Sequence, residues 1–538
     1  MKKDFCIVIP AFKKNAVIPD QLIKKLDGIT LIQRAINTAK EVAVANNIYV
    51  VTDSEEISLI CERNNIEYFK DSNLKINSLN ILIELKFIFE DLGDRYKDFI
   101  LYRANAPLVT SEDVKSAYIK FKRYENSILI TLKKEKHNLY KGSNHTVRSV
   151  SDDSREVFFE EIKAFEIFSY ESVKNLDSEI GVIPYLLNEK AIEIENYQDW
   201  WICEKLLQRK RIVINVVASI KIGMGHIYRA LSIAHEISNH EIIFVCNKDS
   251  EEIVRKLVSS DYKLNVFSSP KLINGIISLE PNIVINDVLN TEKDDILKLK
   301  TENIKCVSFE DLGTGSSFTD LTINELYDIP KSSDENILWG YEYYFVRDEF
   351  NDAVVHSFTD KIKSVLVTYG GTDQTNLTLI TLKSILPECK KNNIKVYIVG
   401  GGGYLYKEDL QNYVNNCGYE NIEVTFASGV ISGIMEKTQI AFSSNGRTVY
   451  ELAQMNIPAI VTSHHSREAE HKFAVLENGF INLGVYESDK TQKMIDNFFK
   501  KLIYDNDYRR LLFEQVKRFD FKNNKQVVLS KILSLIDG

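Results

Sequence analysis

The stretch IVINVVASIKIGMGHIYRALSIAHEIS, residues 212–238, carries the pattern on which the fold of this chain depends. A run of β-branched residues, typical of a buried strand, is followed by a turn and then by apolar residues at helical spacing. Gly223 and Gly225 let the backbone of the turn approach a ligand, and the helix after it offers unpaired N–H groups and the positive end of its dipole. One such turn, taken alone, more often only changes the direction of the chain.

Three further strand-to-helix junctions have the same form. They are VTYGGTDQTNLT (367–378), YIVGGGGY (397–404) and AFSSNGRTVYELAQMNIPAIV (441–461). Each would also serve as a hairpin or a helix cap. Glycine-rich turns at the carboxyl ends of strands in two adjacent sheets, however, are typical of a cleft that binds a ligand. The four junctions together favour a ligand site.

Composition restricts the class of protein. The chain has 538 residues, of which 44% are hydrophobic and 27% charged, with a net charge of −9. This length predicts two to four domains, and the negative charge argues against a nucleic-acid partner. No run approaches the roughly 18 apolar residues of a membrane span, and the start of the chain lacks the form of a signal peptide. We therefore expect a cytoplasmic protein without an integral membrane segment.

The seven cysteines are scattered and include no CxxC pair, which argues against a disulfide framework and against a zinc site. The spacing of His464, His465 and His471 does not match a zinc motif either. We expect no cofactor for the C-terminal part of the chain.

Strand-like and helical patterns alternate along the chain, which predicts an α/β fold with three Rossmann-like sheets. We place the domains at residues 1–208, 209–350 and 351–538, with an irregular segment at 325–358 and helices in the tail from about residue 490. In the first domain the expected strands are 5–11, 47–53, 98–104, 127–134 and 191–196, and the expected helices are 30–45 and 78–93. In the rest of the chain the expected strands are 212–219, 241–247, 264–269, 282–288, 305–311, 364–371, 395–402, 422–428, 440–446 and 458–464.

Residues 211–485 resemble the UDP-sugar hydrolase of pseudaminic acid biosynthesis, a GT-B protein of two Rossmann-like domains related to the glycosyltransferase that makes lipid II. The resemblance rests on IGMGHIYRALSIA, VSFEDLGTGSSFTDLTINELY, WGYEYYFVRDEF, VTYGGTDQTN and NGRTVYELAQMNIPAIV followed by REAEH, which occur in family order. It implies that His226 is a general base toward the anomeric carbon of a nucleotide sugar, a role that suits a neutral imidazole.

The same resemblance implies a binding site for a UDP-sugar. Backbone and side chains of the glycine turns would hold the diphosphate, Glu451 the ribose hydroxyls, and Arg447 would add charge or cap the preceding loop. The expected contacts are Gly223, Gly225, Arg229, Arg347, Gly370, Gly371, Thr372, Ser444, Asn445, Gly446, Arg447, Thr448, Glu451, Glu468 and His471. Asp287 and Asp311, at strand ends, are candidate catalytic residues, although an aspartate that merely begins a turn fits each equally well. The strand before the first turn, NVVAS, lacks the charged residue usual in the hydrolases, so hydrolysis and glycosyl transfer both stay open.

The first domain resembles the CMP-sialic acid synthetases, which are CMP-nonulosonate cytidylyltransferases. The resemblance rests on IVIPAFKKNAVIPDQLIKKLDGITLIQRAI, VVTDSEEISLICERNNIEYF, REVFFEEIKAFEIFSYESV and IGVIPYLLNEKAIEIENYQDWWICEKLL. It implies that Lys13, Lys14 and Arg103 bind CTP and that Glu193 and Glu195, two residues apart on a strand, bind Mg²⁺. It also leads us to expect a homodimer through this domain.

The first domain departs from its family at the phosphate-binding loop. Phe12, Asn15, Ala16, Val17, Asp20 and Gln21 stand where the family has arginine, serine, lysine and glycine. Because several phosphate ligands are missing together, a scaffold or sugar sensor that has lost catalysis is slightly favoured over an active enzyme.

Three functions follow as hypotheses. The leading one is an enzyme of nonulosonic acid synthesis, of the pseudaminic or legionaminic type, whose C-terminal half hydrolyses a UDP-amino-sugar and whose N-terminal half acts on CTP and a nonulosonic acid. The second is a glycosyltransferase with a nucleotide-sugar donor. The third is a protein that binds a nucleotide sugar without turning it over.

Overall fold

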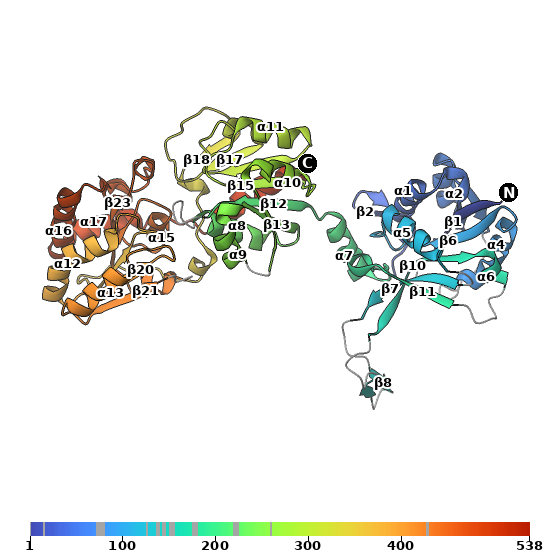
Figure 1. The fold of residues 1–538 in the computed structure, drawn as a ribbon, viewed down its shortest axis with the longest axis horizontal. Coiled ribbons are helices and arrows are strands. Elements are labelled where there is room, and N and C mark those ends of the chain that lie inside the picture. Colours follow the sequence, from blue (N-terminus) through green and yellow to red (C-terminus); the bar gives the residue numbers. More distant parts are fainter. Residues whose placement is uncertain are drawn as a thin grey trace. The chain divides into compact units, whose positions relative to one another are not determined.

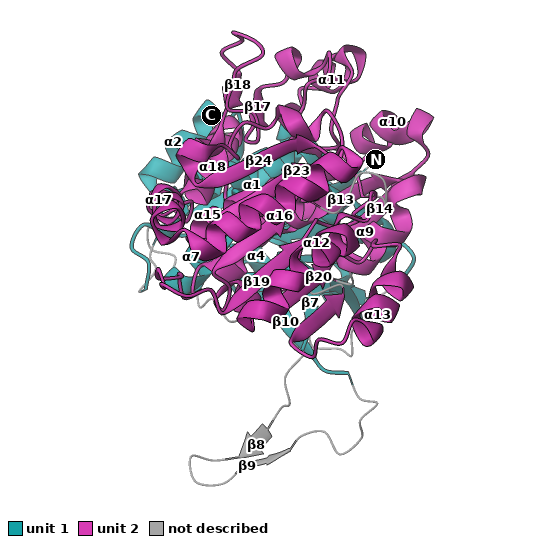
Figure 2. Ribbon diagram, turned by 90° about the vertical axis from the view of Figure 1, so that its left-hand side faces the viewer, with its two compact units in different colours: residues 1–209 teal, residues 210–538 magenta. Residues whose placement is uncertain are grey.

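The computed structural model divides the chain into two compact units, residues 1–209 and 210–538 (Figures 1 and 2). It describes residues 2–13, 17–71, 81–124, 127–135, 140–142, 147–149, 157–174, 181–218, 225–258, 261–426 and 430–537. Gly223 and Lys14, two of the expected ligand-binding residues, lie outside these ranges. No helix in the described part of the chain combines the length and hydropathy needed to span a bilayer.

The first unit is built on one seven-stranded sheet in the order β11-β7-β10-β6-β1-β4-β5. Only β10 runs antiparallel to its neighbours. Its strands are β1 (Lys3–Ala11), β4 (Ile48–Thr52), β5 (Glu67–Lys70), β6 (Tyr96–Tyr102), β7 (Ser127–Lys134), β10 (Phe159–Ser169) and β11 (Gly181–Leu186), and two short hairpins are formed by β2 (Lys25–Leu26) with β3 (Ile29–Thr30) and by β8 (Tyr140–Gly142) with β9 (Val147–Ser149). Its helices are α1 (Leu31–Val42), α2 (Glu55–Arg63), α3 (Ile81–Glu84), α4 (Lys86–Leu92), α5 (Ser111–Phe121), α6 (Tyr170–Lys174) and α7 (Tyr197–Leu207).

The sheet of the first unit is apolar on both faces, as expected for mainly parallel strands. Alternate residues of β1 enter two separate cores: Ile7 and Ile9 pack with α1 and α5, whereas Cys6 and Val8 pack with α4 and α6. Both faces are therefore covered by helices, which is the arrangement that strand-helix alternation predicts.

Two expectations for the first unit are wrong in detail. Residues 191–196 form no strand, because the backbone of Ile194 does not pair with a sheet. The N–H of Ile194 donates to the carbonyl of Asn105, and the carbonyl of Ile194 accepts from the side chain of Gln21. The helix expected at 78–93 is, within its described residues, two short helices, α3 and α4, with Leu85 between them.

The second unit contains two lobes, each with an all-parallel sheet. The first lobe has the order β14-β13-β12-β15-β16-β17-β18 and the second β21-β20-β19-β22-β23-β24. In both, the first strand of the lobe lies inside the sheet, with later strands added on either side. The strand order therefore reverses beside β12 and β19, and such switch points are where α/β proteins bind ligands.

The elements of the first lobe follow the predicted strands closely. They are β12 (Arg211–Val216), α8 (Gly225–Glu236), β13 (Glu241–Asn247), α9 (Glu251–Val258), β14 (Lys263–Phe267), α10 (Leu272–Ile277), β15 (Ile283–Asp287), α11 (Lys293–Thr301), β16 (Lys305–Phe309), β17 (Leu321–Asn324) and β18 (Ile337–Trp339). Within the segment expected to be irregular, β18 forms an edge strand through pairing with β17.

The second lobe repeats the alternation. Its elements are β19 (Ser364–Thr368), α12 (Leu377–Asn392), β20 (Lys395–Gly400), α13 (Lys407–Asn416), β21 (Ile422–Phe426), α14 (Ser432–Met435), β22 (Ile440–Ser443), α15 (Thr448–Gln454), β23 (Ala459–Ser463), β24 (Phe480–Val485), α16 (Ser488–Tyr504) and α17 (Asn506–Val516). The final helix, α18 (Asn524–Asp537), returns to the first lobe, where Val528 and Ile532 join the core of β12 and β15. The predicted α/β class, with a nucleotidyltransferase-like unit followed by a GT-B pair of Rossmann-like lobes, is confirmed.

Candidate active site

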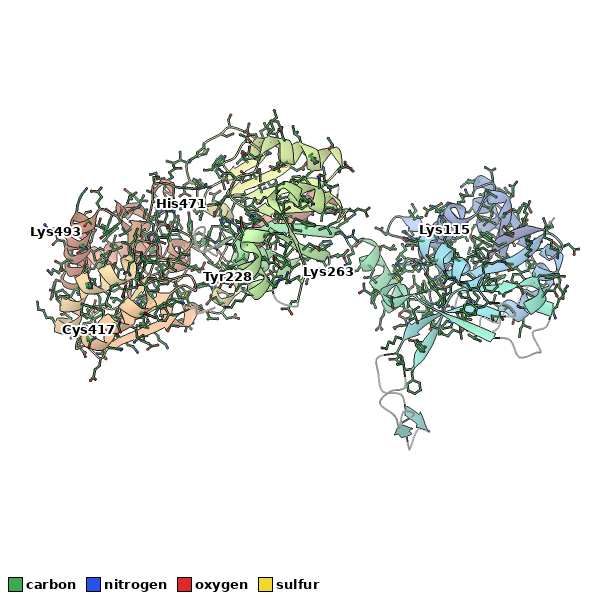
Figure 3. All side chains as sticks on the ribbon, viewed as in Figure 1. Lys115, Tyr228, Lys263, Cys417, His471 and Lys493 are labelled. Carbon is green, nitrogen blue, oxygen red and sulfur yellow. The ribbon has the colours of Figure 1, made fainter. Side chains whose placement is uncertain are left out.

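A cavity of about 490 Å³ is lined by residues of both lobes of the second unit. One face of α8 supplies Gly225, Tyr228, Arg229 and Ser232, at the spacing that places residues on the same side of a helix. Tyr228 is labelled in Figure 3. The remaining lining residues are Glu252, Ile253, Lys256, Leu257, Phe345, Val346, Arg347, Thr368, Gly370, Gly371, Thr372, Val399, Gly400, Gly401, Gly402, Gly403, Ile431, Arg447, Thr448 and Glu451.

Two glycine turns of the second lobe pack backbone against backbone at this cavity. The Gly403 N–H is donated to the carbonyl of Gly371 at 3.0 Å. A Cβ atom on Gly401 would lie 2.3–2.5 Å from backbone atoms of Gly371, far inside van der Waals contact. Gly370 has a φ of +78°, which side-chain-bearing residues rarely adopt. Glycine is thus required at this surface by close approach and by backbone conformation.

The amides at the start of α12 are not available to a ligand, contrary to expectation. The carboxylate of Asp373 accepts the N–H of Leu377 at 2.7 Å and the N–H of Thr378 at 2.8 Å. An acidic side chain at the N-terminus of a helix satisfies its free amides and complements its dipole. Anion binding beside Gly370 is therefore left to the turn itself, without the helix.

His226 and Asp287 form a buried pair at the switch point of the first lobe. His226 is the second residue of α8, after β12, and Asp287 ends the neighbouring strand β15. The Nδ1 atom of His226 lies 2.5 Å from Oδ1 of Asp287, and the two residues are 6% and 1% exposed. The cavity lining includes Gly225 and Arg229, on either side of His226 in the sequence of the helix, and does not include His226 itself.

The charge of Asp287 determines the tautomer of His226. Burial raises the pKa of Asp287, but Arg229 and His226 beside it outweigh this effect and lower the pKa to about 2. An ionised carboxylate can only accept a hydrogen bond, so Nδ1 of His226 carries the proton. Within the described residues Nε2 has no hydrogen-bond partner, and it is the nitrogen that can accept a proton.

Arg229 does not present free donors to a ligand. The N–H groups on Nε and Nη2 of Arg229 donate hydrogen bonds to Asp287, and those on Nη1 donate to Glu310 and Glu325. The residue is 2% exposed. Arg229 lines the cavity, as expected, but its donors bond to carboxylates at the ends of three neighbouring strands.

Arg447 joins this cluster from the second lobe. It forms an ion pair with Glu325, and its guanidinium lies over the ring of Tyr344. Burial and the nearby Arg229 lower the pKa of Arg447 to about 10. Arg447 thus lines the cavity and also contacts the first lobe.

Glu451 lines the cavity and is oriented by Arg347. The Nε of Arg347 is donated to Oε1 of Glu451 at 2.9 Å, and Nη1 of Arg347 lies 2.8 Å from Glu349. Both oxygens of Glu349 are engaged, since Oε2 accepts the N–H groups of Ile431 and Ser432. Arg347, Thr448 and Glu451 are therefore at the cavity, where they were expected.

Asp311 is a turn residue and takes no part in this site. Its carboxylate accepts the N–H and the hydroxyl of Thr291 and the N–H of Gly313, at 2.9, 2.5 and 2.8 Å. The side chain joins the loops after β15 and β16 and does not line the cavity. Its oxygens bond to the loops, which favours the alternative interpretation of Asp311 as a turn residue over a catalytic one.

Replacing Asp311 by alanine is therefore expected to lower stability and to leave catalysis intact. Loss of three buried hydrogen bonds should reduce the free energy of unfolding of the second unit by about 2–4 kcal/mol. Urea unfolding of the full chain measures this loss. A large fall in kcat per folded molecule would instead restore Asp311 to the active site.

Three further expected ligand contacts, Asn445, Glu468 and His471, link loops to each other. The side-chain N–H groups of Asn445 donate to the carbonyls of Glu468 and His471, and Nδ1 of His471 lies 2.7 Å from the carbonyl of Asn445. Oε2 of Glu468 accepts the N–H of His464. Neither these residues nor Ser444 and Gly446 line the cavity; His471 is labelled in Figure 3. Their contact with a ligand stays a prediction.

In the first unit the expected CTP and metal residues are paired with each other or with neighbours. Lys13 forms an ion pair with Glu56 at 2.6 Å, and Arg103 lies 3.7 Å from Glu193, which also accepts from the amide of Asn105. Glu195 is exposed. The described residues contain no cluster of three or more side chains suited to a metal ion.

This donor set does not fit Mg²⁺. The cation prefers six oxygen ligands, whereas one of the two glutamates here already faces a guanidinium, whose charge repels a metal ion. Neither Glu193 nor Glu195 lies on a strand. We derive no chemical step from a metal at this position.

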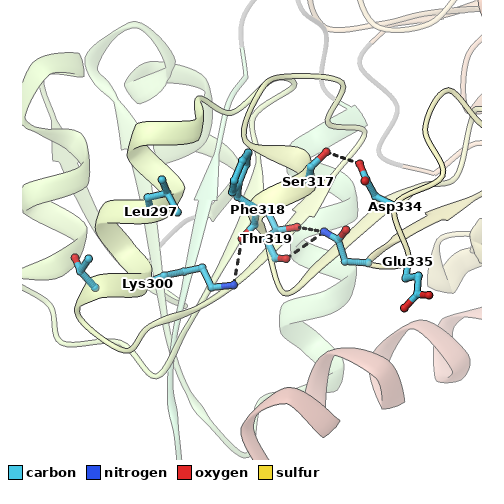
Figure 4. A pocket seen from close by; sticks show the side chains of 9 residues that line it. Leu297, Lys300, Ser317, Phe318, Thr319, Asp334 and Glu335 are labelled. Carbon is cyan, nitrogen blue, oxygen red and sulfur yellow. Dashed lines mark hydrogen bonds between the residues drawn. The ribbon is translucent and has the colours of Figure 1, made fainter.

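A second hollow, of about 870 Å³, lies on the first lobe between α11 and the residues before β18 (Figure 4). Its polar side chains form hydrogen bonds within the lobe. The hydroxyl of Ser317 donates to the carboxylate of Asp334, and the amide of Asn336 donates to the carbonyl and the hydroxyl of Thr319. The ammonium group of Lys300 donates to the carbonyl of Phe318. With its polar groups satisfied in this way, the hollow offers no reactive group.

Comparisons with known proteins give partial likenesses. No family model matches the chain. An uncharacterised protein of Methanocaldococcus jannaschii is 26% identical over 278 residues, which are 48% of this chain and 57% of that protein. The 3-deoxy-manno-octulosonate cytidylyltransferase of Koribacter versatilis is 36% identical over 56 residues, 10% of this chain and 21% of that enzyme. The matches thus span less than two thirds of either relative.

Solved structures similar to parts of the chain are of two kinds. MurG of Acinetobacter baumannii is 13% identical, covers 60% of this chain and 99% of its own, and has a TM-score of 0.44. A CMP:2-keto-3-deoxy-manno-octonic acid synthetase complexed with CTP is 11% identical, covers 38% of this chain and 98% of its own, and has a TM-score of 0.32. The MnaA protein of S. aureus in complex with UDP covers 61% of this chain and 98% of its own, with 12% identity and a TM-score of 0.43.

Several residues of the site escaped prediction from the sequence. Glu310, Glu325 and Glu349 take part through their ion pairs with Arg229, Arg447 and Arg347. Glu310 lies near the end of the predicted strand 305–311, as Asp287 does in 282–288, and this signal would have found it. Glu325 and Glu349 lie in the segment expected to be irregular, and no local pattern marks them.

Proposed function

We propose that residues 210–538 bind a UDP-sugar in the cavity between the lobes and break its anomeric bond, with His226 as the general base. The observation that carries this proposal is the buried pair of His226 and Asp287 at the switch point beside the cavity. Nε2 of His226 takes the proton of a water or sugar hydroxyl while its oxygen attacks C1. The bond from C1 to the β-phosphate oxygen breaks, and UDP leaves with the bonding electrons.

The glycine turns support the proposed binding of the diphosphate and the departure of UDP. The backbone around Gly370, Gly371 and Thr372 and the run Gly400–Gly403 face the cavity without side chains that would fill it. Successive backbone N–H groups in such turns bind anions and stabilise the charge that develops on a leaving diphosphate. Glu451, held by Arg347, is proposed to bind the ribose hydroxyls.

We further propose that the sugar is an amino sugar of the nonulosonic acid pathway and that water is the acceptor. This part rests on the resemblance of residues 211–485 to the hydrolase of pseudaminic acid biosynthesis. The residues NVVAS (215–219) before the turn carry no charge, unlike the hydrolases, and this keeps glycosyl transfer as the alternative.

For the first unit we propose a cytidylyltransferase-like fold that has lost catalysis. The ion pairs of Lys13 with Glu56 and of Arg103 with Glu193 support this view, since the cations that CTP would need are already neutralised. A cytoplasmic location and a homodimer through this unit remain predictions.

Mass spectrometry of reaction products tests both proposals. The full chain is incubated with a panel of UDP-amino-sugars and, separately, with CTP and nonulosonic acids. Free sugar and UDP in the absence of an acceptor support hydrolysis, and UDP release that requires an added acceptor indicates transfer. Calorimetric binding of UDP-sugar without turnover would leave only a binding protein. Formation of a CMP-sugar would contradict the loss of catalysis in the first unit.

A further inference from the structure

We propose that Arg229 is the positioning residue of the pair formed by His226 and Asp287. The inference deepens the proposed function and rests on it for the role of His226. It assigns Arg229 a role other than contact with the ligand.

The orientation of Asp287 depends on a bidentate contact. Nε of Arg229 is 2.8 Å from Oδ2 of Asp287, and Nη2 is 2.5 Å from Oδ1. Two parallel bonds fix the plane of a carboxylate, which one bond does not. Because Oδ1 is also the atom that meets Nδ1 of His226, Arg229 controls where that acceptor stands.

The guanidinium is itself held from its other side. Nη1 is 2.8 Å from Glu310 and 2.7 Å from Glu325, which follow β16 and β17, and the group lies over the ring of Phe309 at 4.8 Å. Lysine, a point charge, cannot make this fork of contacts. Arg229 thus connects Asp287, at the end of β15, to the carboxylates that follow β16 and β17, and these contacts fix the position of Asp287.

The cluster also includes a residue of the second lobe. Arg447 pairs with Glu325, the carboxylate that accepts from Nη1 of Arg229. The position of the Arg229 guanidinium, and through it that of Asp287, therefore also depends on the contact between the lobes.

Two variants test the geometry. Arg229→Lys keeps the positive charge and loses the bidentate contact, whereas Arg229→Gln loses both the contact and the charge. We expect both variants to lower kcat, Arg229→Lys by about 10²-fold with KM changed less than about threefold. Arg255→Gln, at an exposed pair with Glu251, is the matched control and should leave both unchanged.

Long-range ¹H–¹⁵N NMR of the full chain with ¹⁵N-labelled histidine reports the tautomer of His226 and does not require substrate turnover. The His226 signal, assigned by its loss in His226→Gln, should show the proton on Nδ1 in the wild type and a mixture of tautomers in Arg229→Lys. Should Arg229→Gln fail to fold, the double variant Arg229→Gln with Glu310→Gln restores the net charge and is used in its place.

The outcomes distinguish this inference from the proposed function. Wild-type kcat and an unchanged tautomer in Arg229→Lys, or a wild-type proton on Nε2, would overturn the positioning role. If the chain turns over no UDP-sugar but the tautomer of His226 still depends on Arg229, the positioning stands and the proposed base chemistry is rejected.

Discussion

Replacement of His226 by alanine is expected to lower kcat for UDP release by about 10³-fold, within the usual range for loss of a general base. The imidazole is held through Nδ1 by Asp287, which leaves Nε2 as the acceptor of the proton from the attacking hydroxyl. The side chain is not part of the cavity wall, so the affinity for UDP should change less than about threefold. Initial rates and calorimetric titration with UDP measure the two quantities.

His235→Ala is the matched control for this variant. His235 lies on the same helix, α8, with 57% of its side chain exposed and away from the cavity lining. It should retain the wild-type rate. Undiminished UDP release by His226→Ala would remove the base from the proposed mechanism, whereas loss of UDP binding in that variant would indicate a structural role.

Gly401→Ala should abolish productive binding of the diphosphate. The added Cβ atom would lie 2.3 Å from the carbonyl oxygen of Gly371, and neither backbone can yield without moving one of the two turns. Because the turns supply the proposed anion-binding amides together, we expect the dissociation constant of UDP to rise by more than about tenfold and kcat/KM to fall by about 10²-fold.

Gly433→Ala tests whether this effect is specific to the glycine turns. Gly433 lies in α14 of the same lobe, where a Cβ atom would meet nothing within 4 Å. This variant should bind UDP as the wild type does. Normal UDP affinity in Gly401→Ala would mean that the ligand, if any, is held away from these turns.

Local patterns accounted for most of the fold. Continuous β-branched runs such as those of β12 and β19 predict buried parallel strands because both faces of those sheets are covered by helices. The failure at 191–196 has the same basis: its alternating residues suit a strand, but the neighbouring loop, and not a sheet, satisfies its backbone. Whether a suitable segment becomes a strand depends on the available partner.

The glycine turns at 370–371 and 400–403 were also recognisable locally, since the close approach of their backbones requires glycine. His226 and Asp287 were each recognisable from their places at a helix start and a strand end. Their pairing was not, because it depends on the register that puts Asp287 opposite Val216 in the sheet.

By itself, therefore, the sequence of this protein determined its strands, its helices and the residues able to do chemistry, because these follow from spacing along the chain. Only the tertiary structure decided which of those residues act together. In the folded chain the N–H groups of Arg229 bond to three carboxylates, and the first amides of α12 bond to Asp373. The oxygens of Asp311 bond to a turn. The reason is that a buried polar group takes whichever partner packing brings within reach, and that partner is seldom near it in sequence.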